Sequence, residues 1–216
     1  MPHIKYRTKL STSLRLDFLP DSEFRAVVDT MGEIGYPKLA INADLVSFAL
    51  LELVANSLRA HKERKIDEPV RIDFRIEDNA LAVTVVDSGR GFNPTRLPYD
   101  LDAPVAGVDL MSSEFSEYRE KNGGSRFGIG LYVAKKTFPR FNLRFIDRED
   151  QTCPWYSGAV KGTCIDVAVP LAAMVTEPGK EAETVTSHGD KPPKSHLDSF
   201  SPIEDYESLE IIEEVR

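Results

Sequence analysis

The amino-acid sequence predicts an α+β protein, a two-layer sandwich in which helices cover one face of a mixed, mostly antiparallel sheet. Two observations support this prediction. Segments with alternating hydrophobicity occur as hairpin-connected pairs, and longer helical segments separate these pairs. The expected order is strand, two helices, two strands, a long irregular segment, helix and two strands. This order does not alternate strand and helix as a doubly wound fold does.

The first half of the chain contributes one strand and two helices. Leu14, Leu16 and Phe18 alternate with polar residues, which predicts a half-buried strand that ends near Pro20. A short helix should follow, capped by Asp21 or Ser22 and stopped by Gly32 and Gly35. A longer helix is expected from about residue 42 through residue 61. Its apolar residues cover more than one face, so it should be deeply buried.

The second half predicts a hairpin, a loop, a helix and two more strands. The apolar residues of 70–78 alternate cleanly, and the turn Asp78-Asn79 returns the chain into residues 80–89. Residues 92–123 contain three prolines and lack a period, which is typical of a lid or binding loop. A glycine-rich stretch then leads into a third helix, and two strands are expected at 141–149 and 161–171.

Charge divides the 216-residue chain into a nearly neutral body and an acidic tail. Residues 175–216 hold 11 acidic and 4 basic residues, whereas the whole chain has a net charge of −8. We therefore expect a domain at 1–172 and a disordered tail at 173–216, in which a short C-terminal helix could present Ile203, Tyr206, Leu209 or Ile212.

Composition also excludes several classes of function. The acidic balance argues against a nucleic-acid partner bound by bulk electrostatics. No apolar run approaches the roughly 20 residues that a membrane-spanning helix needs. With only two cysteines and no leader-like segment at its start, the chain is expected to be cytoplasmic.

Three segments carry residues suited to chemistry. On the long helix, Glu52 and Asn56 are four residues apart and therefore share a face, where their oxygens could hold a hydrated Mg²⁺. At a strand end, Asp87 precedes Ser-Gly-Arg-Gly, and a carboxylate there can accept a hydrogen bond from an exocyclic amine. Gly123 to Gly130 precede a helix, whose exposed N–H groups attract phosphate. Taken singly, each segment also fits a bland interpretation: a solvent-facing polar stripe, an ordinary turn, or a hinge.

Together, the three segments resemble the ATPase and kinase (GHKL) superfamily, which unites DNA gyrase B subunits, heat-shock chaperones, histidine kinases and mismatch-repair proteins. ELVANSLR (52–59) is similar to the asparagine box, VVDSGRGF (85–92) to the first glycine box, and GGSRFGIGLYVAKK (123–136) to the second. Gly162-Thr163 before the last strand completes the pattern. The resemblance covers roughly residues 10–172.

The resemblance implies a Bergerat-type ATP-binding fold with a site for ATP and Mg²⁺ between the helices and the lid. Glu52 would act as general base or polarise the attacking group, and Asn56 would coordinate the metal. Asp87 would bind the adenine amino group, with Thr163 assisting through water. The remaining implied ATP-binding residues are Arg59 at the phosphates, Gly89 and Gly91 around the base, and Gly128, Gly130 and Leu131 at the second glycine box. Arg119, Lys121 and Arg126 are weaker phosphate candidates.

The resemblance leaves the biochemical activity open. No helical hairpin with a phosphoacceptor histidine fits before the asparagine box, and His61 is expected to be structural. The layout is similar to small bacterial anti-sigma-factor serine kinases, although the second glycine box is closer to that of histidine kinases. Three functions remain: a stand-alone protein kinase in bacterial signalling, an ATP-dependent binding switch with little turnover, or a detached catalytic domain. Each needs a protein partner (a phosphoacceptor, an antagonist or a sigma factor), and a homodimer is possible.

Overall fold

The computed structural model of the protein describes residues 1–121, 129–173 and 210–215, and its strands form two sheets. The larger sheet has seven strands in the order β10-β3-β5-β6-β9-β7-β8, and the smaller has the order β2-β1-β4. The strands are β1 (Ile4–Tyr6), β2 (Lys9–Ser11), β3 (Ser13–Phe18), β4 (Ile34–Gly35), β5 (Val70–Glu77), β6 (Ala80–Asp87), β7 (Arg140–Ile146), β8 (Thr152–Cys153), β9 (Gly162–Pro170) and β10 (Glu210–Val215).

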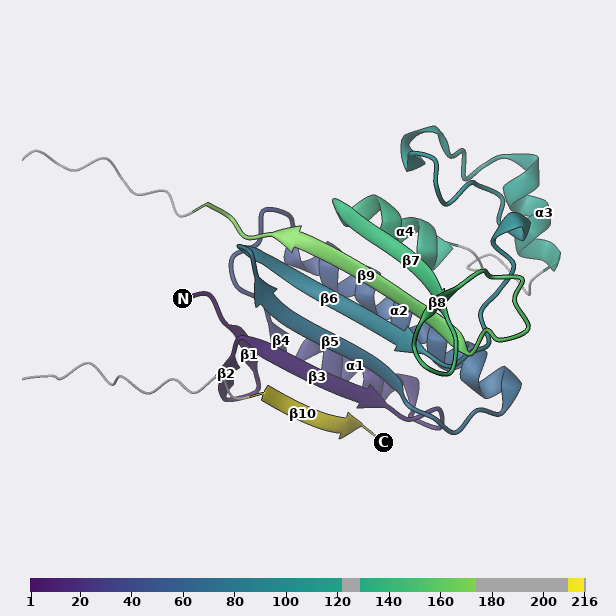
Figure 1. Cartoon of the computed structure of the whole chain (residues 1–216). Helices are drawn as coiled ribbons and strands as arrows, with labels where there is room; N and C mark the ends of the chain where they lie inside the picture. The colour runs from purple at the N-terminus through teal and green to yellow at the C-terminus, as the bar shows by residue number, and fades with distance from the viewer. Residues whose placement is uncertain (122–128, 174–209, 216) are drawn as a thin grey trace, which may run out of the picture. The chain divides into compact units, whose positions relative to one another are not determined.

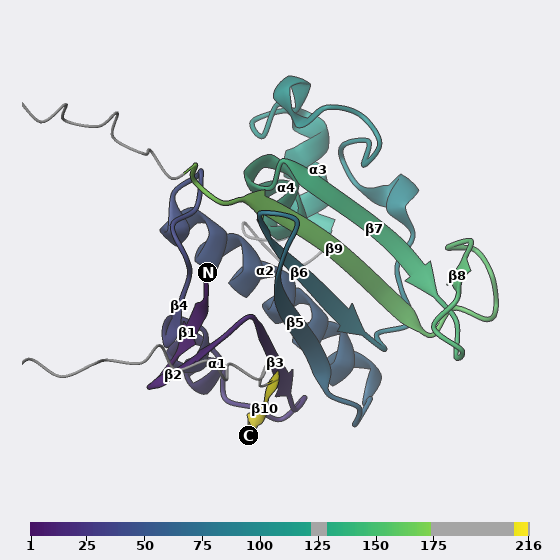
Figure 2. The same ribbon diagram turned by 60° about the vertical axis from the view of Figure 1, so that its left-hand side comes forward.

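Helices α1 (Phe24–Gly32), α2 (Ala43–Arg64) and α4 (Ile129–Thr137) lie on one face of the larger sheet, as Figures 1 and 2 show. Among the described strands, only the pair β10 and β3 is parallel. The α+β sandwich with helices on one face is therefore confirmed. None of the helices in the described ranges is both long and apolar enough to cross a membrane.

The main core lies between the sheet and α2. Alternate residues of the central strands are buried against the helices, as the period of two predicts. In α2, Asn42 caps the N-terminus by accepting from the Asp44 N–H at 2.7 Å, and seven residues along the helix are buried. Ile4 and Tyr6 of the small sheet also belong to this core.

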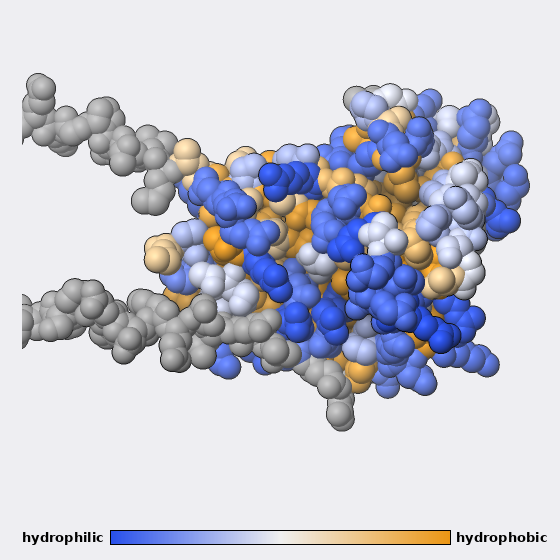
Figure 3. Space-filling view, viewed as in Figure 1, coloured by the Kyte–Doolittle hydropathy of each residue, from blue (hydrophilic) through white to orange (hydrophobic). Residues whose placement is uncertain are grey.

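On the other face of the larger sheet, hydrophilic residues lie beside hydrophobic ones (Figure 3). Arg15 Nε donates to Asp73 across β3 and β5 at 2.6 Å, and Thr84 Oγ1 donates to Asp166 across β6 and β9 at 2.8 Å. Arg144 Nε reaches the second oxygen of Asp166 at 3.2 Å. These cross-strand pairs allow this face to lie without a covering layer of helices.

The lid segment, residues 92–121 of the described chain, contains more structure than the sequence predicted. It includes two 3₁₀ turns, η1 (Pro94–Arg96) and η2 (Val105–Gly107), and the helix α3 (Ser113–Lys121). The expectation of an irregular loop is therefore wrong for the last nine of these residues. Tyr99 stacks on Phe115 with ring centroids 6.0 Å apart and meets Tyr132 of α4 edge-on, so a small apolar cluster supports the lid.

The C-terminus also differs from expectation, because residues 210–215 form a strand where the sequence suggested a short helix. The physical reason is the edge of β3, whose unpaired backbone groups gain partners when another strand is added. Residues 203–209 of the expected helix and the rest of the acidic tail from residue 174 lie outside the described residues.

Candidate functional site

A pocket of about 220 Å³ lies where α2, the end of β6, the start of β9 and the lid segment meet. This volume is below the roughly 300–1,000 Å³ of complete ligand pockets, so it suits the flat base of a larger ligand. Seven sequence-predicted residues line it: Asn56, Arg59, Asp87, Gly89, Gly91, Leu131 and Thr163. Residues more than 100 positions apart in the sequence thus meet in one cavity.

Asp87, the last residue of β6, is the buried acid of this pocket. Its Oδ1 accepts from the Gly89 N–H at 2.7 Å, and its Oδ2 accepts from the Ser57 hydroxyl at 3.3 Å and directly from the Thr163 hydroxyl. Thr163 lies opposite Asp87 in the β6–β9 register. Donors from α2, from β9 and from the turn after β6 therefore orient the carboxylate.

The turn after Asp87 has little room for side chains. A Cβ on Gly89 would lie 2.8 Å from Asp87 Oδ1 and 2.9 Å from the Cβ of Ala60 on α2. Gly91 has φ +61°, and a Cβ there would lie 2.8 Å from the Phe145 ring. Both glycines are thus required by close packing, and at Gly91 also by backbone conformation. This packing brings the turn directly against α2.

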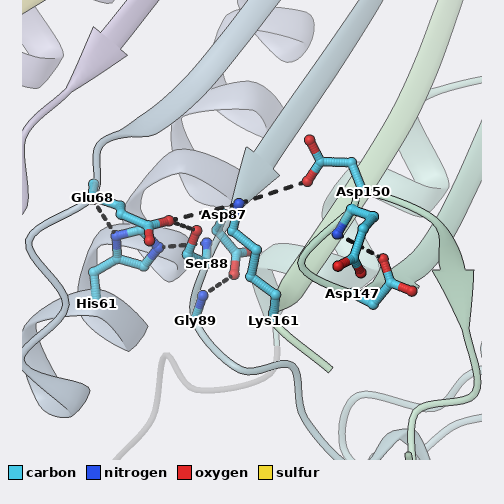
Figure 4. A network of polar contacts seen from close by, with 9 residues as sticks. His61, Glu68, Asp87, Ser88, Gly89, Asp147, Asp150 and Lys161 are labelled. Atoms are coloured by element: carbon cyan, nitrogen blue, oxygen red, sulfur yellow. Dashed lines mark hydrogen bonds and ion pairs between the residues drawn. The ribbon is translucent and has the colours of Figure 1, made fainter. Parts of the chain in front are cut away.

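His61 attaches the same turn to the end of α2 (Figure 4). Its side chain is completely buried, and its Nε2 accepts from the Ser88 N–H at 2.8 Å. With Nε2 as acceptor, Nδ1 carries the proton and donates to the Glu68 carbonyl, also at 2.8 Å. The Ser88 hydroxyl donates to the Glu68 carboxylate, which also faces Lys161 at 3.8 Å. His61 therefore has a structural role next to Asp87.

Glu52 and Asn56 lie about two turns and one turn before Ala60 on α2, close to the first turn of α4. A Cβ built on Gly130 would lie 2.7 Å from Asn56 Nδ2 and 2.8 Å from Glu52 Oε2. The carboxylate and the amide therefore face the N-terminal end of α4, where unpaired N–H groups favour anions. Glu52 and Gly130 lie beside the pocket rather than in its lining. The predicted residue Gly128 lies outside the described residues.

Two of the three weaker phosphate candidates contact the lid instead of the pocket. Arg119 donates to the Leu110 carbonyl and lies over the Phe115 ring, 4.8 Å from its centroid. Lys121 pairs with Glu117 one turn earlier in α3, at 3.5 Å. The interpretation of these two side chains as phosphate ligands is not supported by their contacts, because both are used within the lid. Arg126 lies outside the described residues.

Several lining residues were missed by the sequence analysis. Arg64 donates to the Gly91 carbonyl at 3.1 Å, and it shares a helix face with Asn56 because it lies eight residues further along α2. That spacing was a usable signal. Phe92, Leu97 and Tyr118 come from the lid, and burial raises the pKa of the Tyr118 hydroxyl. No periodicity in the lid sequence indicated which of its side chains would face the pocket.

The residues present fit a magnesium-bound nucleotide better than a bare metal site. Within residues 1–121, 129–173 and 210–215, no group of three or more His, Cys, Asp or Glu side chains is placed to hold a metal. Glu52 offers a carboxylate oxygen beside the first turn of α4, and Asn56, whose Nδ2 faces Gly130, carries an amide oxygen as well. Mg²⁺ usually combines one or two protein oxygens with water and substrate phosphates.

The fold and this pocket define the chain as a nucleotide-binding α+β sandwich. The model of the family described as "Histidine kinase-, DNA gyrase B-, and HSP90-like ATPase" matches residues 41–173, more than half of the chain. The chain therefore belongs to this ATP-binding family. No curated protein matches the sequence. The family match begins just before α2, so β1 to β4, α1 and β10 lie outside it.

Proposed function

We propose that this protein binds Mg-ATP and transfers the γ-phosphoryl group to a side chain of a separate partner protein in bacterial signalling. One observation carries the proposal. Glu52 and Asn56 converge on Gly130 at the start of α4, next to the pocket that holds Asp87. The residues proposed as base-binding acid, as metal ligand and as general base therefore lie in or directly beside the same pocket.

The proposed roles follow from the chemistry of each side chain. Asp87 accepts a hydrogen bond from the adenine amino group, while Asn56 holds the ion through its amide oxygen. Bound Mg²⁺ neutralises charge on the phosphates during transfer. With a serine acceptor, Glu52 takes the proton of the attacking hydroxyl as the oxygen–phosphorus bond forms; with a histidine acceptor, a ring nitrogen attacks through its lone pair. In both cases ADP leaves with the electrons of the broken bond. The partner is a phosphoacceptor, an antagonist protein or a sigma factor. The transfer takes place in the cytoplasm.

A second function is favoured by the construction of the lid. Lys135 of α4 donates to the carbonyls of Leu101 and of Ala103, the latter at 2.7 Å, and the lid also contributes Leu97 and Tyr118 to the pocket. A ligand in the pocket therefore contacts a segment with its own apolar core. In this alternative, ATP stabilises one arrangement of the lid and thereby changes a partner-binding surface, with little turnover.

The decisive experiment incubates the purified chain with γ-labelled ATP, Mg²⁺ and proteins that co-purify with it. Label on a serine or histidine of a partner supports the kinase. Tight ATP binding without transfer to any partner would refute the kinase and favour the switch. For Glu52→Ala we expect retained ATP binding and lost transfer, whereas transfer at the wild-type rate would exclude Glu52 as the base.

The site itself is tested by nucleotide affinity. We expect Asp87→Asn and Asn56→Asp to abolish Mg-ATP binding, because each changes the hydrogen-bonding or metal-binding character of a side chain that lines the pocket. Asp73→Asn is a matched control, since Asp73 pairs with Arg15 on the face of the sheet without helices. Undiminished affinity in both site variants would refute the assignment.

A further inference from the structure

The C-terminal strand β10 lies beside β3 at the edge of the larger sheet (Figures 1 and 2). The two strands are parallel, with Glu210 opposite Ser13 and Val215 opposite Phe18. Neither strand falls within the family match at residues 41–173. The contact therefore joins two segments that lie outside the matched residues.

The end of β10 is held by backbone and apolar contacts. The Val215 carbonyl accepts from the Leu19 N–H at 3.2 Å and from the Ser22 hydroxyl at 3.0 Å. The Val215 side chain is 8% exposed and belongs to the main core. An extended segment at this edge therefore needs an apolar residue in the register position of Val215.

Arg7, in the turn between β1 and β2, contacts β10 through charge. Its Nη1 and Nη2 reach the two carboxylate oxygens of Glu213 at 3.2 and 3.0 Å, and its Nε donates to Glu33 at 2.6 Å. Burial, followed by the negative charge of Glu213, raises the pKa of the neighbouring Tyr6 to about 12. A forked contact of this kind selects a carboxylate over other side chains.

These contacts are specific in chemistry but local in extent. The pairing covers six residues of β10 on one side only, and the Arg7 side chain remains about half exposed, at 53%. Exposed ion pairs stabilise weakly, and edge strands exchange partners more readily than central ones. When β10 is displaced, the β3 edge presents unpaired backbone groups next to a cation.

We propose that the β3 edge and Arg7 form a binding surface for an extended acidic and apolar segment of a partner protein, which adds to the sheet in place of β10. The segment runs parallel to β3. It carries a carboxylate in the register position of Glu213, opposite Leu16, and an apolar residue opposite Phe18. Backbone pairing supplies affinity and the two side chains supply selectivity. The surface does not depend on the nucleotide chemistry proposed above.

The test uses the full chain and a fluorescein-labelled peptide of residues 208–216 as the probe. Glu213→Arg in the chain places two cations together and should displace its own β10. We therefore expect the peptide to bind this variant at least about tenfold more tightly than the wild-type chain, measured by fluorescence anisotropy. The Leu19 amide should lose hydrogen-exchange protection in the variant and regain it when peptide is added. Equal affinity for both chains, or no binding to the variant, would overturn the proposal.

Charge selectivity is tested with a second chain variant, Arg7→Glu. It should reject the unchanged peptide and bind a peptide carrying Glu213→Arg. Lys9→Glu, in the adjacent strand β2, is the matched control and should leave both affinities as in the wild-type chain. Circular dichroism checks that each variant is folded. If Arg7→Glu bound both peptides equally, Arg7 would not read the carboxylate. If the wild-type chain formed dimers that Glu213→Arg abolished, the occupant would be a second copy, and the proposed partner would be wrong.

Discussion

A single methyl group added at Gly130 should weaken nucleotide binding while changing the stability of the fold only slightly. It is buried in the first turn of α4, and a Cβ there would lie 2.7 Å from Asn56 Nδ2, 2.8 Å from Glu52 Oε2 and 3.2 Å from Glu52 Cβ. Gly130→Ala therefore places a methyl group against Asn56, the proposed metal ligand, and Glu52, the proposed general base.

Two opposing effects on stability can be compared. Replacing glycine by alanine within a helix stabilises it by up to about 1 kcal/mol. Overpacking costs about 1–3 kcal/mol, and the lower end applies here because the nearest two atoms are ends of flexible side chains that can rotate away. The free energy of unfolding should therefore change by less than about 1.5 kcal/mol. Rotation moves Glu52 and Asn56 out of position, and we expect Mg-ATP affinity to fall at least about tenfold, or ~1.4 kcal/mol.

The assay measures Mg-ATP binding by isothermal titration calorimetry and stability by urea unfolding of the same samples. Gly32→Ala is a matched control, because Gly32 ends α1 and a Cβ there would meet nothing within 4 Å. The control should keep its ATP affinity and lose no stability. Wild-type Mg-ATP affinity in Gly130→Ala would show that the positions of Glu52 and Asn56 beside Gly130 are not needed for binding.

Three further predictions concern stability. Gly162→Ala should destabilise the protein by at least about 3 kcal/mol in urea unfolding, since its Cβ would lie 1.7 Å from the Asp87 carbonyl oxygen; a folded, stable variant would contradict this contact. His61→Ala should cost about 3–5 kcal/mol, because it removes a buried ring and the acceptor of the Ser88 N–H; a loss below about 1 kcal/mol would contradict the buried network. Burial raises the pKa of Cys164 from 9.0 to about 11, so the unfolded chain releases this proton first and stability should fall as the pH rises between these values. Cys164→Ala should flatten that fall when unfolding is measured at pH 8 and pH 10, and an unchanged slope would exclude the thiol as its cause.

Periodicity predicted the central elements because their burial is regular. Residues of β5 and β6 alternate between core and solvent over eight positions each, and α2 is long enough for its apolar faces to be evident. The small sheet escaped prediction because its strands have only two or three residues, too few to show a period. Their pairing depends on tertiary neighbours rather than on local pattern.

The residues of the candidate site also fall into those that local motifs predicted and those that only the tertiary packing placed. Asp87, Gly89, Gly91 and Asn56 were predicted because motifs record local requirements, such as a glycine with positive φ or two polar residues one turn apart. The lid residues that reach the pocket could not be predicted, because their direction is decided by the apolar cluster around Phe115.

The sequence by itself determined the α+β class, the ATP-binding family pattern and seven of the residues that line the pocket. Each of these is encoded in contiguous segments whose spacing sets the geometry. Only the tertiary structure decided that Glu52 and Asn56 face Gly130, that Arg119 is used within the lid, and that β10 forms a strand beside β3. The physical reason is that a strand edge and a close glycine contact each need a partner distant in sequence, which local propensity does not specify. The direction of the Arg119 side chain depends on how the lid packs around Phe115.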